Sequence, residues 1–134
     1  QAALGLAQIE RIEELLLRKR EIFYFYKQLL DNIDDIELNN EPIGTLNSFW
    51  MPTIVVGKSY KNFSRDLFFD ELKNHNIDVR PFFYPLSSLP MFEVVNNKIS
   101  YDIYLRAFNL PSFHDITIEE QEKVVDIFKN YLIT

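Results

Sequence analysis

Residues 9–30 read IERIEELLLRKREIFYFYKQLL, a stretch with a helical period. Glu14 stands four residues before Arg18 on its charged face, the order that favours an ion pair along a helix. We therefore predict one helix from the first residue to about Leu30, long enough to bridge two bodies of a protein. The apolar residues recur at intervals of three, four and seven, the spacing of one helix face, at Ile9, Ile12, Leu16, Phe23, Tyr26 and Leu30.

The start of this helix lacks a capping residue. The chain begins QAALGLAQ, and no Ser, Thr, Asp or Asn precedes Gln1 to accept hydrogen bonds from the first amides. We interpret residues 1–31 as a long helix cut in its middle. Removal of a signal peptide and a frayed terminus are the alternatives that the sequence leaves open.

The rest of the chain alternates between strand and helix signals. Short strands are expected at residues 36–38, 47–56 and 77–80. Helices are expected after Asn62 or Ser64, from Ser100 to Arg106 or Ala107, and after Thr117. Thr117 and Glu120 form a capping-box pattern that opens a helix running nearly to Thr134. This order predicts one α/β domain over residues 32–134, with a small antiparallel or mixed sheet covered by helices.

Composition narrows the classes of protein. The chain has 134 residues, 47% hydrophobic and 25% charged, which is typical of a soluble globular domain and fits a cytoplasmic protein. A net charge of -6 argues against nucleic-acid binding, because phosphate backbones attract basic surfaces. The absence of cysteine excludes disulfide scaffolds, thiol catalysis and Cys-based zinc sites, and two histidines are few for a metal site. No apolar run approaches the roughly 18 residues of a membrane-spanning helix.

The residues supply no self-sufficient catalytic set. A Ser-His-Asp triad would need a tight nucleophile turn, and the Gly-x-Ser-x-Gly pattern is missing. His114 and Asp115 adjoin in a loop before a capped helix, so we interpret His114 as solvated or bonded to backbone. We expect His75 at a helix end, where an imidazole interacts well with terminal carbonyls.

Residues 82–92 read FFYPLSSLPMF and follow Arg80 and Pro81 closely. The prolines exclude a regular helix or a central strand, which leaves a stiff apolar loop. This loop is either the wall of a ligand pocket or plain core, and composition favours core. Two readings of Arg80 remain open: a two-pronged clamp for a carboxylate or phosphate, or a surface ion pair at a strand end.

Three stretches resemble sugar aminotransferases of the DegT/DnrJ/StrS type, in the right order and over nearly the whole chain. Residues 1–12, QAALGLAQIERI, are similar to the start of the family's linking helix. Residues 77–86, IDVRPFFYPL, resemble its G-I-x-x-R-P-x-F-x-P-L-H stretch, in wording closest to a perosamine-synthase-like branch. Residues 110–117, LPSFHDIT, resemble the L-P-x-x-x-x-L-T that opens its last helix.

The resemblance implies a pyridoxal-phosphate (PLP) enzyme with the aspartate-aminotransferase fold, in which a long linking helix leads to a small, mostly antiparallel C-terminal domain. Such homodimers move an amino group from glutamate to a nucleotide-linked keto-sugar for polysaccharide or deoxysugar synthesis. The Schiff-base lysine lies in the large N-terminal domain, which this chain lacks. Lys27, Lys73 and Lys98 each fit a solvated helix or loop. We therefore expect neither bound PLP nor transaminase activity from this chain alone.

The same resemblance places Arg80, Tyr84 and Ser87 on the substrate side, with Phe82 or Phe83 as a wall. Ser87 stands where many members have histidine, which puts the sugar preference in doubt. No catalytic residue and no metal ligand are expected here. The rival interpretation is a stand-alone, non-catalytic α/β binding or interaction module that uses the aromatic loop as a partner surface.

Overall fold

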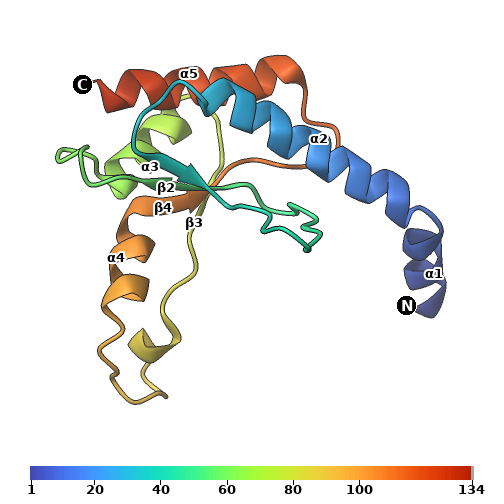
Figure 1. Ribbon diagram of the computed structural model, residues 1–134, viewed down its shortest axis with the longest axis horizontal. Coiled ribbons are helices and arrows are strands. Elements are labelled where there is room, and N and C mark those ends of the chain that lie inside the picture. Colours follow the sequence, from blue (N-terminus) through green and yellow to red (C-terminus); the bar gives the residue numbers. More distant parts are fainter. Residues whose placement is uncertain (134) are drawn as a thin grey trace.

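The structure, a computed structural model, describes residues 1–133. Its helices pack around a small central sheet, and one loop and one helix extend away from it (Figure 1). The last residue, where the predicted domain ends, lies outside the described part. The elements are α1 (Ala2–Glu10), α2 (Ile12–Leu30), β1 (Ile36–Leu38), β2 (Thr53–Val56), α3 (Arg65–Asn74), β3 (Arg80–Pro81), the 3-10 turn η1 (Leu86–Ser88), α4 (Lys98–Arg106), β4 (Ala107–Asn109) and α5 (Ile118–Leu132).

The sheet is antiparallel, in the order β1-β2-β4-β3. Ile54 of β2 lies opposite Phe108 of β4, and Arg80 of β3 lies opposite Asn109. Because β3 is an edge strand, Pro81 is tolerated there although it has no N–H to donate. The predicted α/β architecture with a mostly antiparallel sheet is confirmed.

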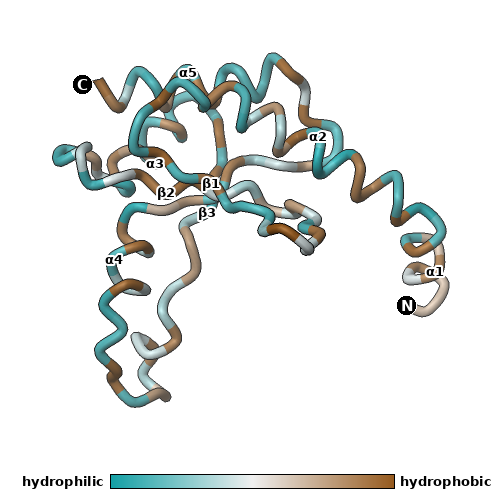
Figure 2. Tube along the Cα trace, in the orientation of Figure 1, coloured by the Kyte–Doolittle hydropathy of each residue, from teal (hydrophilic) through white to brown (hydrophobic). Residues whose placement is uncertain are grey.

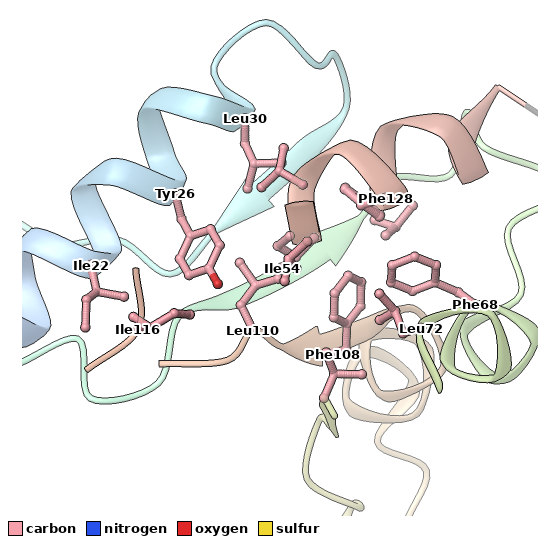
Figure 3. Packing of buried hydrophobic residues seen from close by; sticks show 14 residues of the cluster. Ile22, Tyr26, Leu30, Ile54, Phe68, Leu72, Phe108, Leu110, Ile116 and Phe128 are labelled. Carbon is pink, nitrogen blue, oxygen red and sulfur yellow. The ribbon is translucent and has the colours of Figure 1, made fainter. Parts of the chain in front are cut away.

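The core lies between the sheet and helices α2, α3 and α5 (Figure 3). Ile54 and Val56 alternate with half-buried neighbours along β2, as expected for a strand with one covered face. The rings of Phe68, Phe108 and Phe128 meet with centroids 5.2 to 5.6 Å apart. One aromatic residue from α3, one from β4 and one from α5 thus join the two helices to the sheet.

The predicted single long helix is wrong at one point. Arg11, with φ -111° and ψ 10°, separates α1 from α2, and α1 turns aside from the axis of α2 (Figure 1). The Arg11 guanidinium bonds Glu14 in the first turn of α2. None of residues 2–10 is buried, so no packing holds α1 in line, although its apolar content is high (Figure 2).

The strands also differ from the prediction. β2 begins at Thr53 rather than at residue 47, because Pro52 has no N–H and Phe49 adopts φ 48°, an unusual conformation for a bulky residue. The Phe49 ring stacks on Phe23 at 3.7 Å, which compensates the strained backbone. The strand predicted at 77–80 is displaced to Arg80–Pro81, because the Ile77 N–H is used to close helix α3. Strand β4 was not predicted.

Two of the three predicted helix caps are confirmed and one is wrong. Ser64 accepts a hydrogen bond from the Leu67 amide, and Thr117 forms the predicted capping box with Glu120. The predicted cap at Ser100 is wrong, since α4 already begins at Lys98 after Asn97, whose side chain makes no capping bond. Its end at Arg106 agrees with the prediction.

Candidate functional site

Residues 82–106, which we call the arm, comprise the aromatic loop and α4 and extend away from the core (Figure 1). The preference for core in the loop is wrong, because Phe83, Leu86 and Met91 are 65%, 67% and 73% exposed. The physical reason is the position of β3 at the sheet edge, since the chain that leaves it has no further layer to cover it. The arm therefore presents an apolar, aromatic surface.

Arg80 forms an exposed ion pair with Asp78, with Nη2 3.0 Å from Oδ2 and both side chains about three quarters exposed. Of the two interpretations of Arg80, an anion clamp or a surface ion pair, the structure contains the surface ion pair. An exposed pair of this kind contributes little free energy, so an incoming anion can compete for the guanidinium at low cost.

Beside Arg80 lies a hollow of about 590 Å³ between the segments around residues 75–80 and 109–116 and the first turns of α5. Its wall is mainly apolar, with Val79, Leu110 and Phe113 among its residues. His75 and Lys123 add cationic or polar groups at its border. Apolar walls with a few polar groups are typical of small-molecule sites, so this hollow and the arm are the candidate surfaces.

Tyr84 and Ser87 both contact α4 rather than Arg80. The ring of Tyr84 lies 4.5 Å from the ring of Tyr104, and Ser87 Oγ lies 3.1 Å from the Tyr101 hydroxyl. The hydroxyl of Tyr104 raises the pKa of Tyr84. Tyr101 and Tyr104 were missed in the sequence; their spacing of three on one helix was the available signal.

Phe82 is half-buried at the base of the arm, where its N–H donates to the Ala107 carbonyl at 3.3 Å. Its neighbour Phe83 is mostly exposed, and their ring centroids are 6.4 Å apart. In the sequence, Phe82 and Phe83 stand between Arg80 and Tyr84. The structure places the predicted residues on one continuous segment but gives Arg80 and Tyr84 different partners.

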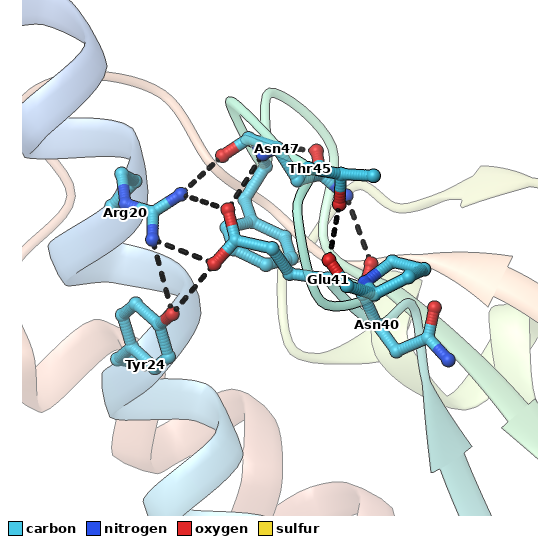
Figure 4. A network of polar contacts seen from close by, with 8 residues as sticks. Arg20, Tyr24, Asn40, Glu41, Thr45 and Asn47 are labelled. Carbon is cyan, nitrogen blue, oxygen red and sulfur yellow. Dashed lines mark hydrogen bonds and ion pairs between the residues drawn. The ribbon is translucent and has the colours of Figure 1, made fainter.

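A polar network fastens the segment before β2 to α2 (Figure 4). Arg20 donates to both carboxylate oxygens of Glu41, at 2.6 and 2.8 Å, and to the Asn47 carbonyl at 2.5 Å. The Asn47 N–H also donates to Glu41 at 2.6 Å. The Arg20 guanidinium, with the Asn47 amide, lowers the pKa of Glu41 to about 2. This network positions residues 41–47 and does not need a ligand to explain it.

Four lysines were compared with the requirements of a Schiff base, and none of the four fits them. Lys27, Lys73 and Lys98 are exposed, which agrees with the solvated positions predicted for them. Lys19 is partly withdrawn from water, and burial lowers its pKa, but its ammonium donates to the Ser112 carbonyl. A Schiff-base lysine needs a free, desolvated amine, which none of these four side chains offers.

The histidines have structural surroundings. His75 is the C-cap of α3, as expected for a helix end, and its ring Nε2 lies 3.2 Å from the carboxylate of Glu71 one turn earlier. The backbone carbonyl of His114 accepts a hydrogen bond from Arg18, in the loop before α5 as predicted. Within residues 1–133, no cluster of three or more His, Asp or Glu is arranged to hold a metal, and no helix has the length and apolarity to cross a membrane.

Comparisons with solved structures agree with the architecture. DesI, crystallised in the presence of its TDP-sugar product, superimposes with a TM-score of 0.84 at 18% identity, over 98% of this chain and 34% of DesI. The PLP form of Spr1654 from Streptococcus pneumoniae also gives 0.84, at 23% identity, over 98% of this chain and 35% of that one. This chain therefore shares the fold of about a third of each of these two proteins.

Sequence comparisons identify the family. The profile described as the DegT/DnrJ/EryC1/StrS aminotransferase family matches residues 1–129, and the chain belongs to that family. GDP-perosamine synthase of Vibrio cholerae is 31% identical over 134 residues, which cover 97% of this chain and 36% of that protein. The dTDP-4-amino-4,6-dideoxy-D-glucose transaminase of Escherichia coli is 30% identical over 135 residues, which cover 96% of this chain and 35% of that protein. The chain thus spans about a third of the length of these relatives.

Proposed function

We propose that this chain is the C-terminal domain of a PLP-dependent aminotransferase that moves an amino group from glutamate to a nucleotide-linked keto-sugar, for cell-surface polysaccharide or deoxysugar synthesis. The family match over residues 1–129, together with relatives almost three times as long, carries the proposal. PLP supplies the carbanion chemistry when bound, and its lysine belongs to the part of the protein upstream. The domain described here contributes binding and closure.

The substrate residues of this domain are Arg80, Tyr84 and Ser87, with Phe82 as a wall. Arg80 is an exposed guanidinium beside an apolar hollow, a setting suited to binding the diphosphate of a sugar nucleotide. Tyr84 and Ser87 offer hydroxyl groups along the arm, where they can meet the polar groups of a sugar. These roles require that the arm face the cofactor domain.

Exposed apolar side chains support the presence of a further domain. α1 carries Leu4, Leu6 and Ile9 at 58% to 73% exposure, and the loop before β2 carries Leu46 and Trp50 at 81% and 59%. In Figure 1, α1 lies beyond the end of α2 and the arm extends below β3 and β4, so both stand away from the core. Exposed apolar surfaces of this kind mark interfaces. In the intact protein, the part upstream of this chain would cover them.

The second candidate function is a stand-alone interaction module, which the same exposed arm favours. A partner protein would then cover the arm in place of a cofactor domain. The length of the intact gene product separates the two proposals, since an upstream stretch of domain size supports the aminotransferase. The further expectations are a homodimer in the cytoplasm, which light scattering on the purified intact product and cell fractionation would test.

Arg80→Ala in the intact gene product tests the site. Loss of charge-assisted hydrogen bonds to a substrate anion costs about 1.5–3 kcal/mol, so we expect the KM for the sugar nucleotide to rise at least about tenfold. Lys73→Ala is the matched control, because Lys73 is also a cation about three quarters exposed and paired with a neighbouring acid, Asp70. An unchanged KM in Arg80→Ala would remove Arg80 from the substrate site.

A further inference from the structure

The substrate loop has few ties to the sheet beyond its first residue. The Phe82 N–H bonds the Ala107 carbonyl, but Tyr84 and Leu86 are 59% and 67% exposed. The Ser88 hydroxyl bonds the Pro85 carbonyl within the loop itself. The direction in which Tyr84 points therefore depends on what the loop touches outside the core.

α4 supplies that contact through two tyrosines one turn apart. The ring of Tyr104 packs against the ring of Tyr84 with centroids 4.5 Å apart and planes at 37°. The Tyr101 hydroxyl lies 3.1 Å from Ser87 Oγ. Because residues three apart share a helix face, Tyr101 and Tyr104 form one edge against which the loop rests.

α4 in turn needs an anchor, because none of residues 98–106 is buried. Arg65, the first residue of α3, provides one. Its Nη1 donates to the Tyr104 carbonyl at 2.5 Å, and its Cζ lies 4.5 Å from the centroid of the Tyr104 ring. The Asp66 carboxylate accepts hydrogen bonds from Nε and Nη2, at 3.1 and 2.9 Å.

Arg65 is only 8% exposed, although it carries a full charge. Burying a charge is costly unless it is paired and hydrogen-bonded, and the planar guanidinium satisfies its donors in fixed directions. The guanidinium also lies near a second aromatic ring, since Arg65 Cζ is 5.8 Å from the centroid of the Phe69 ring. The position of Tyr104 relative to α3 is therefore determined by both its carbonyl and its ring.

We propose that Arg65 is a positioning residue that fixes Tyr104 and, through its ring, holds Tyr84 and the loop 82–88 in place for the sugar nucleotide. This inference rests on the proposed function. Arg65 itself does not touch the substrate. Arg106 anchors the other side of α4 by donating to the Val56 carbonyl at 2.6 Å and pairing with Asp102, and it makes no part of the contact with Tyr84.

The experiment uses the intact gene product with four variants. Arg65→Lys keeps the charge but loses the planar fork, and Tyr104→Leu removes the ring that Tyr84 rests on. Tyr104→Phe keeps the ring and the backbone carbonyl but removes the hydroxyl, which accepts a hydrogen bond from Arg65 Nη2 at 3.4 Å. Leu105→Ala is the control, since Leu105 is the next residue of α4 and is 64% exposed. The measurements are amide hydrogen exchange of residues 82–92, and KM and kcat for a nucleotide keto-sugar.

We expect exchange in residues 82–92 to rise at least about tenfold in Arg65→Lys and Tyr104→Leu, with the rest of the domain unchanged. The KM should rise about tenfold while kcat stays within about twofold, because the loop is misplaced and the chemistry is elsewhere. Leu105→Ala should match the unmodified protein, and Tyr104→Phe, which loses only the long hydrogen bond from Arg65, should raise the exchange by less than Tyr104→Leu. If Arg65→Lys fails to fold, Tyr104→Leu carries the test, since Tyr104 is only half-buried.

Unchanged exchange of the loop in Tyr104→Leu would overturn the inference, and so would a KM that stays constant while the exchange rises. An equal rise throughout the domain would also overturn it, by showing a general structural role. An intact product that does not aminate sugar nucleotides refutes the proposed function. In that case the exchange measurement alone decides whether Arg65 and Tyr104 hold the loop.

Discussion

The hydroxyl of Tyr26 joins the linking helix to the segment beside the Arg80 hollow. Tyr26 is fully buried in α2, and its hydroxyl donates to the Pro111 carbonyl at 2.9 Å. Burial raises the pKa of Tyr26 far above its usual value, so the hydroxyl remains a donor across the working pH range. Tyr26→Phe keeps the ring and removes the donor, which leaves the Pro111 carbonyl without this partner.

Losing one buried hydrogen bond and stranding its acceptor costs about 1–3 kcal/mol, and we expect about 2 kcal/mol here. For a domain of this size that corresponds to a fall in Tm of about 6 °C. Urea unfolding followed by circular dichroism should show a lower midpoint with an unchanged slope. Amide exchange in residues 110–116 should also rise.

Tyr24→Phe is the matched control, because Tyr24 lies on the same helix, is 44% exposed and has a hydroxyl 3.4 Å from Glu41. We expect its free energy of unfolding to stay within about 0.5 kcal/mol of that of the unmodified chain. Equal losses of stability in the two variants would refute the reasoning, because burial of the hydroxyl would then make no difference.

Three further predictions concern the polar network, the last helix and the arm. The pKa of Glu41 is lowered from 4.5 to about 2, so its ionised form stabilises the fold above pH 4.5 and this stabilisation is lost as the pH falls toward 2. Between these two pH values, the Tm of the unmodified chain should therefore fall more steeply than the Tm of Glu41→Gln. Thr117→Ala should cost about 1 kcal/mol in urea unfolding, through loss of the helix cap. Phe83→Ser should change stability by less than about 0.5 kcal/mol in the same assay, since Phe83 lies exposed on the arm; a large loss would place it in the core.

Elements encoded by neighbouring residues could be predicted. Thr117 and Glu120 lie three apart and fix the start of α5 through their own backbone amides. β4 could not be predicted, because a three-residue strand is defined by its pairing with β2 and β3 and not by its own pattern. The break at Arg11 was missed for a related reason: the period continues through it, and only the absence of packing on α1 allows the turn.

The candidate site shows the same difference between features encoded by neighbouring residues and features that depend on distant contacts. The resemblance predicts Arg80, Tyr84 and Ser87 as substrate residues, and this stays a prediction, whereas the residues that contact the arm from the core come from distant parts of the chain. Arg65 and Tyr104 are 39 positions apart, and no local pattern links them. The exposure of the aromatic loop could not be read from composition either, because the same residues would serve a core or an interface.

We propose that this chain closes an active site whose reactive part lies upstream. The most direct test is to assay the 134-residue chain and the intact gene product in parallel, with PLP, glutamate and a nucleotide-linked keto-sugar, and to measure the aminated sugar nucleotide by mass spectrometry. We expect amination by the intact product and none by the chain alone. Amination by the isolated chain would contradict the proposal.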